Sequence, residues 1–476
     1  MMQLKELLPQ TLAKVAPSLN IEGIAYKIDD VKKNYLFVAR KGEKFDSHKL
    51  IGKAKSMGAV CAICEYKVDI DLPQIIVDNV RDILAYISHR FYGEPSKKLQ
   101  VVGITGTNGK TTSTHLIRHI LETCGISTGL IGTVNYVIGK RMQKAGLTTP
   151  ESLDIAKMMN EMLKNGNKVC VMEVSSHAIS LLRTKYIDFD IAGLTNIGRD
   201  HLDFHGSLEN YIATKIELFK ALAQDKFAVL NHDINEFEQF RKSTRAKVLT
   251  YGKKGDIKYK LLRSDFKGLV LEIFHNGEKN LIESKLLGEH NVGNILLAFG
   301  VAKTLGIPVE KIKEGIETFT GVRGRFERIG NVIIDYAHTP DAMEKVLNSA
   351  RKLTNGRIIC VFGCGGDRDR GKRPIMGKVA TTLSDFTIIT SDNPRSEPPL
   401  KIIEDIEKGA KPHRYKKIIS RKEAIEEAIQ LANGNDLVLL LGKGHEDYQI
   451  IGNERIPFDE HEFVKKCLRK KESICN

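Results

Sequence analysis

The chain has 476 residues, of which 42% are hydrophobic and 28% charged, as in ordinary soluble globular proteins. One hydrophobic core stops growing at ~250 to 300 residues, so we expect two or three domains. Lys and Arg number 73 against 59 Asp and Glu, and the formal charge of +14 favours anionic partners. The basic residues are scattered and Trp is absent, which argues against nucleic acid and for small phosphorylated or carboxylated molecules.

Neither a secretion signal nor a membrane span is expected. The first residues, MMQLKELLPQTLAKV, contain no continuous apolar stretch, and no apolar run reaches the ~18 residues that a spanning helix needs. The eight Cys are dispersed, which is typical of reduced thiols in a cytoplasmic protein. Cys61 and Cys64 form a C-x-x-C in GAVCAICEY, but no second pair completes a metal site, so we predict buried thiols of a strand.

Three α/β domains are predicted, over residues 1–98, 99–328 and 329–476. In the first, YLFVAR and GAVCAICEY alternate with helical patterns, and YGEPSKKLQ suits a linker. In the second, KVCVMEV, FDIAGLTNI and FAVLNHD alternate with helices, which predicts a largely parallel, doubly wound sheet. The third repeats the pattern with NVIIDYA, GRIICVFG, DFTIITSD and DLVLLLGKG, and resembles a Rossmann-like domain. Ligands of such sheets gather at the carboxyl ends of the strands.

The strongest local signal is GITGTNGKTT at residues 103–112, between a predicted strand and a helix that Gly125 ends. Lys110 is expected to meet the β- and γ-phosphates of a nucleotide, and the Thr111 hydroxyl to meet Mg²⁺. Ile104 stands where the strict P-loop pattern has its first Gly, and a Gly-rich turn without a ligand is the alternative. The flanking elements favour ATP or GTP, bound also by Gly106, Thr107, Asn108, Gly109 and Thr112.

Two further segments carry polar residues at strand ends. Glu173 follows VCVM and suits Mg²⁺, although a solvated glutamate is the simpler interpretation. His201 follows another strand, and Tyr211 and Lys215 share one face of the next helix. Lys215 is either an ordinary surface lysine or a neutral, partly buried amine that reacts with CO₂ to form a carbamate. The helical pattern alone does not show a carbamate, so the surface lysine is the simpler interpretation.

Nine motifs, in order along almost the whole chain, resemble those of the Mur ligases: GITGTNGKTT, EVSSHA, NIGRDHLDFHG, GEHNVGNILLA, GRFE, DYAHTPD, GCGGDRDRGKRP, DNPR and GKGHED. The chain is most similar to the tripeptide synthetases of that family. The resemblance implies that ATP phosphorylates a carboxylate of a UDP-linked muramoyl dipeptide, and that an amine then displaces phosphate to form an amide in cytoplasmic peptidoglycan precursor synthesis. Cations must shield the anions that meet in such a reaction.

Site residues follow from the same resemblance. Lys110, Glu173, His201 and Lys215 are the implied catalytic set, with one Mg²⁺ on Thr111 and Glu173 and a second on His201 and carbamylated Lys215. The implied contacts to ATP add Asn291, Arg325 and Asp335, and those to the UDP-linked substrate are Thr148, Thr149, Ser175 and Arg183. The N-terminal domain resembles the uridine-binding domain of the family through YLFVARKGEKFDSH, but Ile28 replaces the usual Ser.

The third domain is expected to select the amine. DNPR is the form that this loop takes in members that add meso-diaminopimelate, and a guanidinium can bind the second carboxylate of that amino acid with two hydrogen bonds. The implied contacts are Arg368, Asp392, Asn393, Pro394, Arg395, Gly442 and Glu446.

Three alternatives remain. A lysine-adding synthetase would lack the Arg of DNPR, and a folylpolyglutamate synthetase would show Gly-Ser after the P-loop lysine, where this chain has Thr111-Thr112. A P-loop nucleic-acid motor or a regulatory nucleotide-binding module would leave EVSSHA, DYAHTPD and DNPR unexplained. We expect a monomer with small-molecule substrates, whose domains close to bring ATP, precursor and amino acid together.

Overall fold

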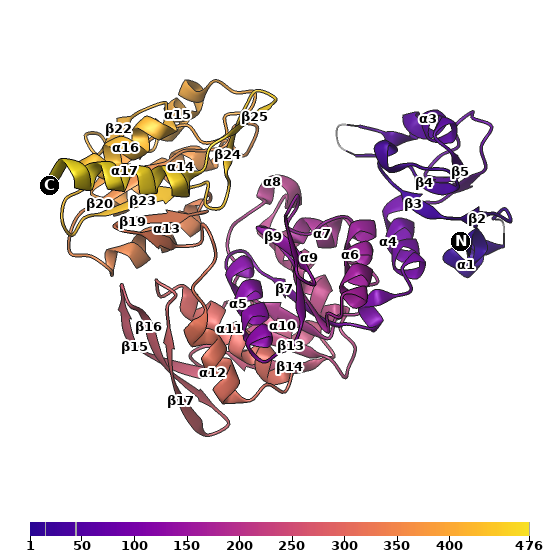
Figure 1. The fold of residues 1–476 in the computed structure, drawn as a ribbon, viewed down its shortest axis with the longest axis horizontal. Coiled ribbons are helices and arrows are strands. Elements are labelled where there is room, and N and C mark those ends of the chain that lie inside the picture. Colours follow the sequence, from indigo (N-terminus) through magenta and orange to yellow (C-terminus); the bar gives the residue numbers. More distant parts are fainter. Residues whose placement is uncertain (15, 43–44, 476) are drawn as a thin grey trace.

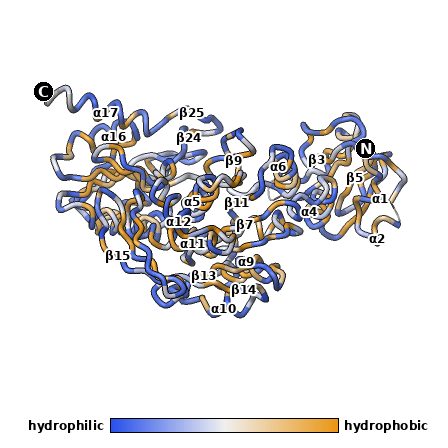
Figure 2. Tube along the Cα trace, turned by 60° about the horizontal axis from the view of Figure 1, so that its bottom comes forward, coloured by the Kyte–Doolittle hydropathy of each residue, from blue (hydrophilic) through white to orange (hydrophobic). Residues whose placement is uncertain are grey.

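Three α/β domains follow one another in the computed structural model, which describes residues 1–14, 16–42 and 45–475. The N-terminal and C-terminal domains lie at opposite ends of the central one (Figure 1). Hydrophobic stretches concentrate inside the domains, for example around β7 and β11 (Figure 2). In the described ranges, we find no helix with the length and apolar character needed to cross a membrane.

The N-terminal domain is built on a four-stranded parallel sheet. Helices α1 (Leu4–Leu7) and α4 (Val80–Phe91) cover one face, and α3 (Ile51–Ser56) covers the other. The strands, in spatial order, are β3 (Gly23–Ala25), β4 (Tyr35–Val38), β5 (Ala59–Cys64) and β6 (Gln74–Ile76).

The two thiols of the C-x-x-C lie in β5, and both are buried. Burial raises the pKa of Cys61 to about 12 and that of Cys64 to about 11, so neither is a reactive thiolate. The prediction of buried strand thiols is confirmed. All seven cysteines with described side chains are free. Glu43 and Lys44, in the motif that resembles the uridine-binding domain, lie outside the described residues.

The central domain contains an eight-stranded sheet that is parallel except at one edge, where β9 and β10 run antiparallel. Alternate residues of each strand point to opposite faces: Val102 and Ile104 pack against α5, α11 and α12, whereas Val101 packs against the side of α6, α9 and α10. The doubly wound fold predicted for this domain is confirmed. In spatial order the strands are β10 (Arg141–Lys144), β9 (Asn135–Ile138), β8 (Thr128–Ile131), β11 (Val169–Glu173), β7 (Gln100–Thr105), β12 (Ile191–Leu194), β13 (Phe227–Asn231) and β14 (Lys247–Tyr251).

Helices cover both faces of this sheet. They are α5 (Lys110–Thr123), α11 (Asn291–Thr304) and α12 (Val309–Thr318) on one side, and α6 (Ser152–Lys164), α9 (Leu208–Lys220) and α10 (Phe237–Ser243) on the other.

An antiparallel meander follows, made of β15 (Lys258–Asp265), β16 (Gly268–His275) and β17 (Glu278–Ser284). Asn276 and Gly277 join the last two strands with φ of 50° and 80°, the positive values of an Asn-Gly hairpin turn. This meander is not among the elements predicted from the sequence, although the Asn-Gly pair that follows the apolar run LVLEIF indicates a hairpin.

The third domain contains a six-stranded sheet, parallel except for edge strand β18. The expected boundary after residue 328 falls inside β18. A two-stranded hairpin, β24 (Tyr448–Ile451) and β25 (Glu454–Pro457), projects from this domain. The sheet strands, in spatial order, are β18 (Glu327–Ile329), β19 (Val332–Asp335), β23 (Leu437–Leu441), β20 (Ile358–Phe362), β21 (Phe386–Ile389) and β22 (Tyr415–Lys417).

Its helices again cover both faces. They are α13 (Pro340–Arg351), α14 (Lys372–Leu383) and α15 (Pro399–Glu407) on one side, and α16 (Arg421–Leu431) and α17 (Glu460–Cys475) on the other.

Candidate active site

The Gly-rich loop joins β7 to α5, as predicted. Gly106 and Gly109 have φ of 137° and 86°, which side chains other than hydrogen rarely allow. A Cβ at Gly106 would lie 1.9 Å from Thr195 Oγ1, so only glycine lets the loop pass the end of β12. The loop leads into the N-terminus of α5, whose free amides and helix dipole favour phosphate.

Two lysines meet at one carbonyl of this loop. Lys110 Nζ donates to the carbonyls of Gly106 and Thr107, both at 2.8 Å, and Lys215 Nζ donates to the same Gly106 oxygen at 3.0 Å. Lys215 is only 1% exposed, so the surface-lysine interpretation is wrong. Burial, and then the charge of Lys110, hold the pKa of Lys215 well below its usual value. Lys215 therefore loses its proton more readily than an ordinary lysine.

Glu173 ends β11 and is fully buried, which excludes a solvated strand-end glutamate. Its carboxylate accepts only neutral donors: the Thr111 hydroxyl at 3.1 Å, and the Thr133 amide and hydroxyl at 2.8 and 2.9 Å. It forms no ion pair with any residue that the structure describes. A buried carboxylate beside hydroxyl oxygens, with its charge unbalanced by a neighbouring ion pair, fits a hard divalent cation.

His201 lies farther out, at the start of α8 (Leu202–His205), with a left-handed φ of 52°. Its Nε2 lies 3.5 Å from Asp200 Oδ2, and its ring centroid is 4.5 Å from that of His177. Over the described ranges, no three His, Cys, Asp or Glu side chains are arranged to hold a metal. A cation bound by His201 would need oxygen from phosphate, water or a modified side chain.

The four residues expected to meet the UDP-linked substrate lie together beside Glu173. The Thr149 hydroxyl donates to the Glu173 carbonyl at 2.8 Å and accepts from the Ser175 amide at 3.1 Å. Arg183 Nη1 donates to the Thr149 carbonyl at 3.1 Å, and the Thr148 hydroxyl lies 3.1 Å from Thr133 Oγ1.

Sequence reasoning missed Arg40, Arg81 and Glu151, which lie next to these residues. The Glu151 carboxylate, 6% exposed, forms an ion pair with Arg40 of the N-terminal domain, and lies 3.6 Å from Arg81 Nη1 and 3.7 Å from Arg183 Nε. Three guanidinium groups from two domains thus surround one carboxylate that directly follows the Thr148-Thr149-Pro150 loop. Only the position of Glu151 after that motif pointed to it in the sequence.

Residues expected at the nucleotide come from α11, from the segment just before β18 and from the end of β19. Asn294 connects α11 to α5, since its amide donates to Asn291 Oδ1 at 2.7 Å and its oxygen accepts from the Ser113 hydroxyl at 3.2 Å. Arg325, in the segment that leads from the central to the third domain, donates through Nη2 to Thr111 Oγ1 at 3.2 Å. Asp335 already accepts two backbone amides, each at 2.7 Å, so it also holds the start of the third domain in place.

One direct contact joins the Gly-rich loop to the third domain. Asn108 Nδ2 donates to Asp341 Oδ2 at 2.9 Å, and Lys345 donates to the same oxygen at 2.9 Å. Asp341 lies in the first turn of α13. The third domain therefore contacts the loop that is expected to hold phosphate.

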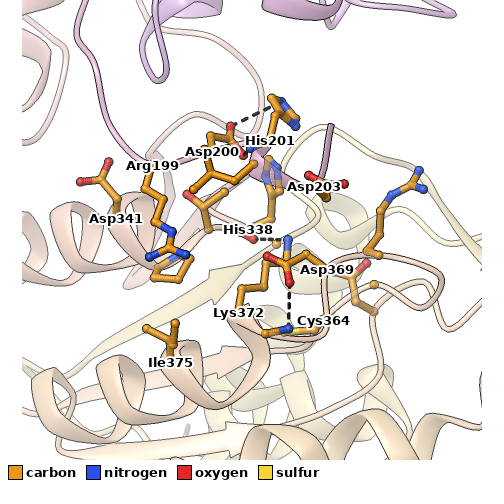
Figure 3. Close-up of a pocket in the computed structure, with 18 of the residues that line it drawn as sticks. Arg199, Asp200, His201, Asp203, His338, Asp341, Cys364, Asp369, Lys372 and Ile375 are labelled. Atoms are coloured by element: carbon orange, nitrogen blue, oxygen red, sulfur yellow. Dashed lines mark hydrogen bonds and ion pairs between the residues drawn. The ribbon is translucent and has the colours of Figure 1, made fainter. Parts of the chain in front are cut away.

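A cavity of about 990 Å³ lies between the central and third domains. Figure 3 shows Arg199, Asp200 and His201 of the central domain on one side, with Asp369 and Lys372 of the third domain opposite. The cavity is also lined by six of the seven residues expected to select the amine, namely Arg368, Asp392, Asn393, Arg395, Gly442 and Glu446. Arg199 and Lys372 add cationic groups that the sequence reasoning did not assign.

Arg395 has a left-handed backbone, with φ of 52°. Its amide donates to the Ile450 carbonyl at 3.1 Å, and its carbonyl accepts from the Gly452 amide at 2.8 Å. Its Nη1 donates to the Gly366 carbonyl at 2.9 Å, while Nε and Nη2 donate to no described residue. That free edge of the guanidinium has the geometry for a carboxylate.

Glu446 is already paired within the protein. Its Oε2 accepts from Lys443 Nζ at 3.0 Å and from Asn393 Nδ2 at 2.8 Å. Lys443 is fully buried and also donates to Asn393 Oδ1 at 3.1 Å. The Asp392–Arg395 loop is therefore joined to the loop of Glu446 through Asn393.

Two family models match the chain. The "Mur ligase middle domain" matches residues 104–302, and the "Mur ligase, glutamate ligase domain" matches residues 324–444. The two matched ranges contain most of the residues of the candidate site.

Curated proteins and solved structures are similar over nearly the full length. A UDP-N-acetylmuramoyl-L-alanyl-D-glutamate--2,6-diaminopimelate ligase of Aquifex aeolicus (strain VF5) is 44% identical over 454 residues, with 94% of each chain covered. One of the same name from Clostridium tetani is 42% identical over 489 residues, covering 98% of this chain and 100% of the relative. A solved structure of that name matches with a TM-score of 0.69 and 29% identity, over 99% of this chain and 100% of the other.

Proposed function

This chain belongs to the Mur ligase family, and we infer that it is an ATP-dependent amide ligase joining 2,6-diaminopimelate to UDP-N-acetylmuramoyl-L-alanyl-D-glutamate in peptidoglycan precursor synthesis. The choice of diaminopimelate as the amine rests on the position of Arg395. Its guanidinium lines the cavity between two domains and has two nitrogens that donate to no described residue. A second carboxylate on the entering amino acid fits that group, and lysine has none.

The three domains are assigned one substrate each. Residues 1–98 are proposed to hold the uridine end of the precursor, 99–328 to hold ATP, and 329–476 to hold meso-diaminopimelate. Thr148, Thr149, Ser175 and Arg183 are proposed to contact the muramoyl peptide, since their polar groups meet beside Glu173. The protein is proposed to act as a cytoplasmic monomer.

The chemistry needs an activated carboxylate. A carboxylate resists attack by an amine until one oxygen becomes a good leaving group, so ATP transfers its γ-phosphoryl group to the glutamyl carboxylate and ADP leaves. The amine then attacks the acyl carbon, phosphate leaves, and a proton is lost from nitrogen. Lys110 and Arg325, both next to Thr111 or its loop, are proposed to balance the negative charge of the transferred group.

Magnesium is proposed at Glu173 and Thr111, with a second ion at His201 and a carbamate of Lys215. When bound, Mg²⁺ shields the repulsion between triphosphate and carboxylate. The Lys215 carbamate forms when the deprotonated amine attacks CO₂ and a proton is released, which turns the amine into an anionic oxygen ligand. Support comes from the burial of Lys215 and from its sharing of the Gly106 carbonyl with Lys110.

A panel assay tests the function directly. Purified protein with ATP, Mg²⁺ and the UDP-linked dipeptide should release phosphate with meso-diaminopimelate, and mass spectrometry should show a product heavier by one residue of that amino acid. L-lysine, D-alanyl-D-alanine and glutamate should give little product. Equal use of L-lysine would reassign the chain to the lysine-adding synthetases, and phosphate release stimulated by DNA or RNA would favour the motor alternative.

The environment of Glu151 leads to a prediction about the precursor. Glu151→Gln should raise the KM for the UDP-linked dipeptide roughly tenfold. The variant loses the ion pair with Arg40 that orients the guanidinium groups beside the proposed precursor contacts, and one charge-assisted contact is worth about 1.5 kcal/mol or more. The KM values for ATP and diaminopimelate should stay within about twofold of wild type, since other domains and loops bind them.

Glu161→Gln is the matched control, because Glu161 lies on α6, the helix that Glu151 caps, and its ion pair with Arg141 is exposed. It should leave all three KM values unchanged. An unchanged precursor KM in Glu151→Gln would show that the three guanidinium groups serve only the fold.

A further inference from the structure

A buried ion pair lies next to the loops that carry Arg368 and Arg395, two of the arginines that line the cavity between the central and third domains. Glu397 follows Arg395 by two positions, and its carboxylate receives both terminal nitrogens of Arg373: Nη2 to Oε1 at 2.8 Å and Nη1 to Oε2 at 3.0 Å. Arg373, on α14, is fully buried, and the Glu397 side chain is 9% exposed. Hydrogen bonds from Arg373 lower the pKa of Glu397 to about 2, so its negative charge persists at neutral pH.

The same carboxylate joins the loop of Arg368 to the loop of Arg395, although the two loops lie far apart in the sequence. Glu397 Oε1 accepts from the Asp367 amide at 2.7 Å, next to Arg368. The neighbouring Ser396 hydroxyl donates to Asp367 Oδ1 at 2.6 Å. The loop of Arg368 is thus held to the loop of Arg395 by side chains that lie outside the cavity lining.

Both loops contain a backbone conformation that must be held in place. Asp367 and Arg395 have φ of 55° and 52°, a region that costs a residue other than glycine about 1 kcal/mol or more. Such residues persist only where their surroundings determine them. At Asp367 those surroundings are Glu397 and Ser396, and the Gly366 amide beside it donates to the Asn393 carbonyl at 2.9 Å.

We propose that Glu397, oriented by Arg373, is a positioning residue for amino-acid selection, which holds Arg368 and Arg395 so that both face the distal carboxylate of the entering amino acid. The inference rests on the proposed function, since it assumes an amino acid with a second carboxylate. Glu397 itself makes no contact with that substrate. Its effect passes through the two loops.

Kinetics of Glu397→Gln test the proposal. The variant keeps the shape of the side chain but loses the charge that orders Arg373 and Asp367. We expect the KM for meso-diaminopimelate to rise about tenfold or more, while the KM values for ATP and the UDP-linked dipeptide stay within about twofold. The ratio of kcat/KM for diaminopimelate over L-lysine should fall by a similar factor, which a loss of folded protein alone would not produce.

Asp405→Asn is the matched control. Asp405 is the other carboxylate partner of Arg373, at 3.0 Å from Nη1, but it contacts neither loop. It should leave the KM for diaminopimelate and the selectivity unchanged. Arg373→Lys, which keeps the charge but loses the two-pronged contact, should change selectivity in the same direction as Glu397→Gln, and it replaces that variant if thermal unfolding shows Glu397→Gln to be unfolded.

The outcomes distinguish the positioning role of Glu397 from the proposed ligase function. Unchanged selectivity in a folded Glu397→Gln, equal rises in all three KM values, or an equal effect of Asp405→Asn would overturn the positioning role and leave the ligase function intact. Failure of the wild-type protein to join diaminopimelate to the precursor would overturn both.

Discussion

Replacing Lys215 should abolish ligation. We expect Lys215→Ala and the volume-matched Lys215→Met to lose about 10²- to 10³-fold or more in kcat, the size of effect seen when a group that stabilises developing charge is removed. The physical reason is the proposed carbamate, which a buried amine with a lowered pKa can form beside Lys110. The alanine and methionine variants have no amine and cannot form it. High bicarbonate should not restore activity to any of the variants.

The modification has a readout independent of turnover. Wild-type protein in ¹³C-bicarbonate should show a carbamate carbon by NMR, and native mass spectrometry should show a labile mass of CO₂; Lys215→Met should show neither. Lys220→Ala, at an exposed ion pair on the same helix, is the control and should behave like wild type. Full activity in a folded Lys215→Met would refute the assignment.

Removing the guanidinium at position 395 should selectively impair the use of one substrate, meso-diaminopimelate. Arg395→Ala should lower kcat/KM for meso-diaminopimelate by roughly 10²-fold, since two charge-assisted hydrogen bonds are worth about 3 kcal/mol together. The affinities for ATP and for the UDP-linked dipeptide should change by less than about twofold. Arg395→Lys should recover part of the loss, because it keeps the charge without the planar fork.

An amino acid that lacks the second carboxylate tests whether Arg395 selects the substrate. Turnover of L-lysine, however slow, should be nearly the same in Arg395→Ala and wild type. Arg414→Ala, an exposed arginine elsewhere in the third domain, controls for the loss of a positive charge. A parallel loss toward both amino acids would mean that Arg395 supports the loop and does not select the substrate.

Local patterns sufficed for the parts of the fold that depend on neighbours in sequence. The helix predicted between the Gly-rich loop and Gly125 forms as α5, where Leu116, Ile117, Ile120 and Leu121 recur at helical spacing and are all fully buried. Alternating apolar strands and helices indicated the doubly wound sheets because each strand must be covered on both faces.

The contacts that assemble the site could not be predicted in the same way, because they join residues far apart in the chain. Arg40, Arg81 and Glu151 meet only because the N-terminal domain packs on α6, and Asn108 meets Asp341 across more than 200 positions. The burial of Lys215 was also undecided from its helical spacing. A lysine beside an apolar stripe has the same pattern whether its end reaches water or the Gly106 carbonyl.

The hydrogen bond between Asn108 and Asp341 has a thermodynamic consequence for how strongly each ligand affects the binding of the other. It connects the Gly-rich loop, which is proposed to hold phosphate, with the first helix of the domain that is proposed to take the amino acid. If nucleotide and amino acid both bind better to that arrangement of the two domains, nucleotide tightens amino-acid binding by a certain factor, and reciprocity requires the amino acid to tighten nucleotide binding by the same factor. The Asn108 amide would then contribute to the coupling of two binding equilibria at separate sites.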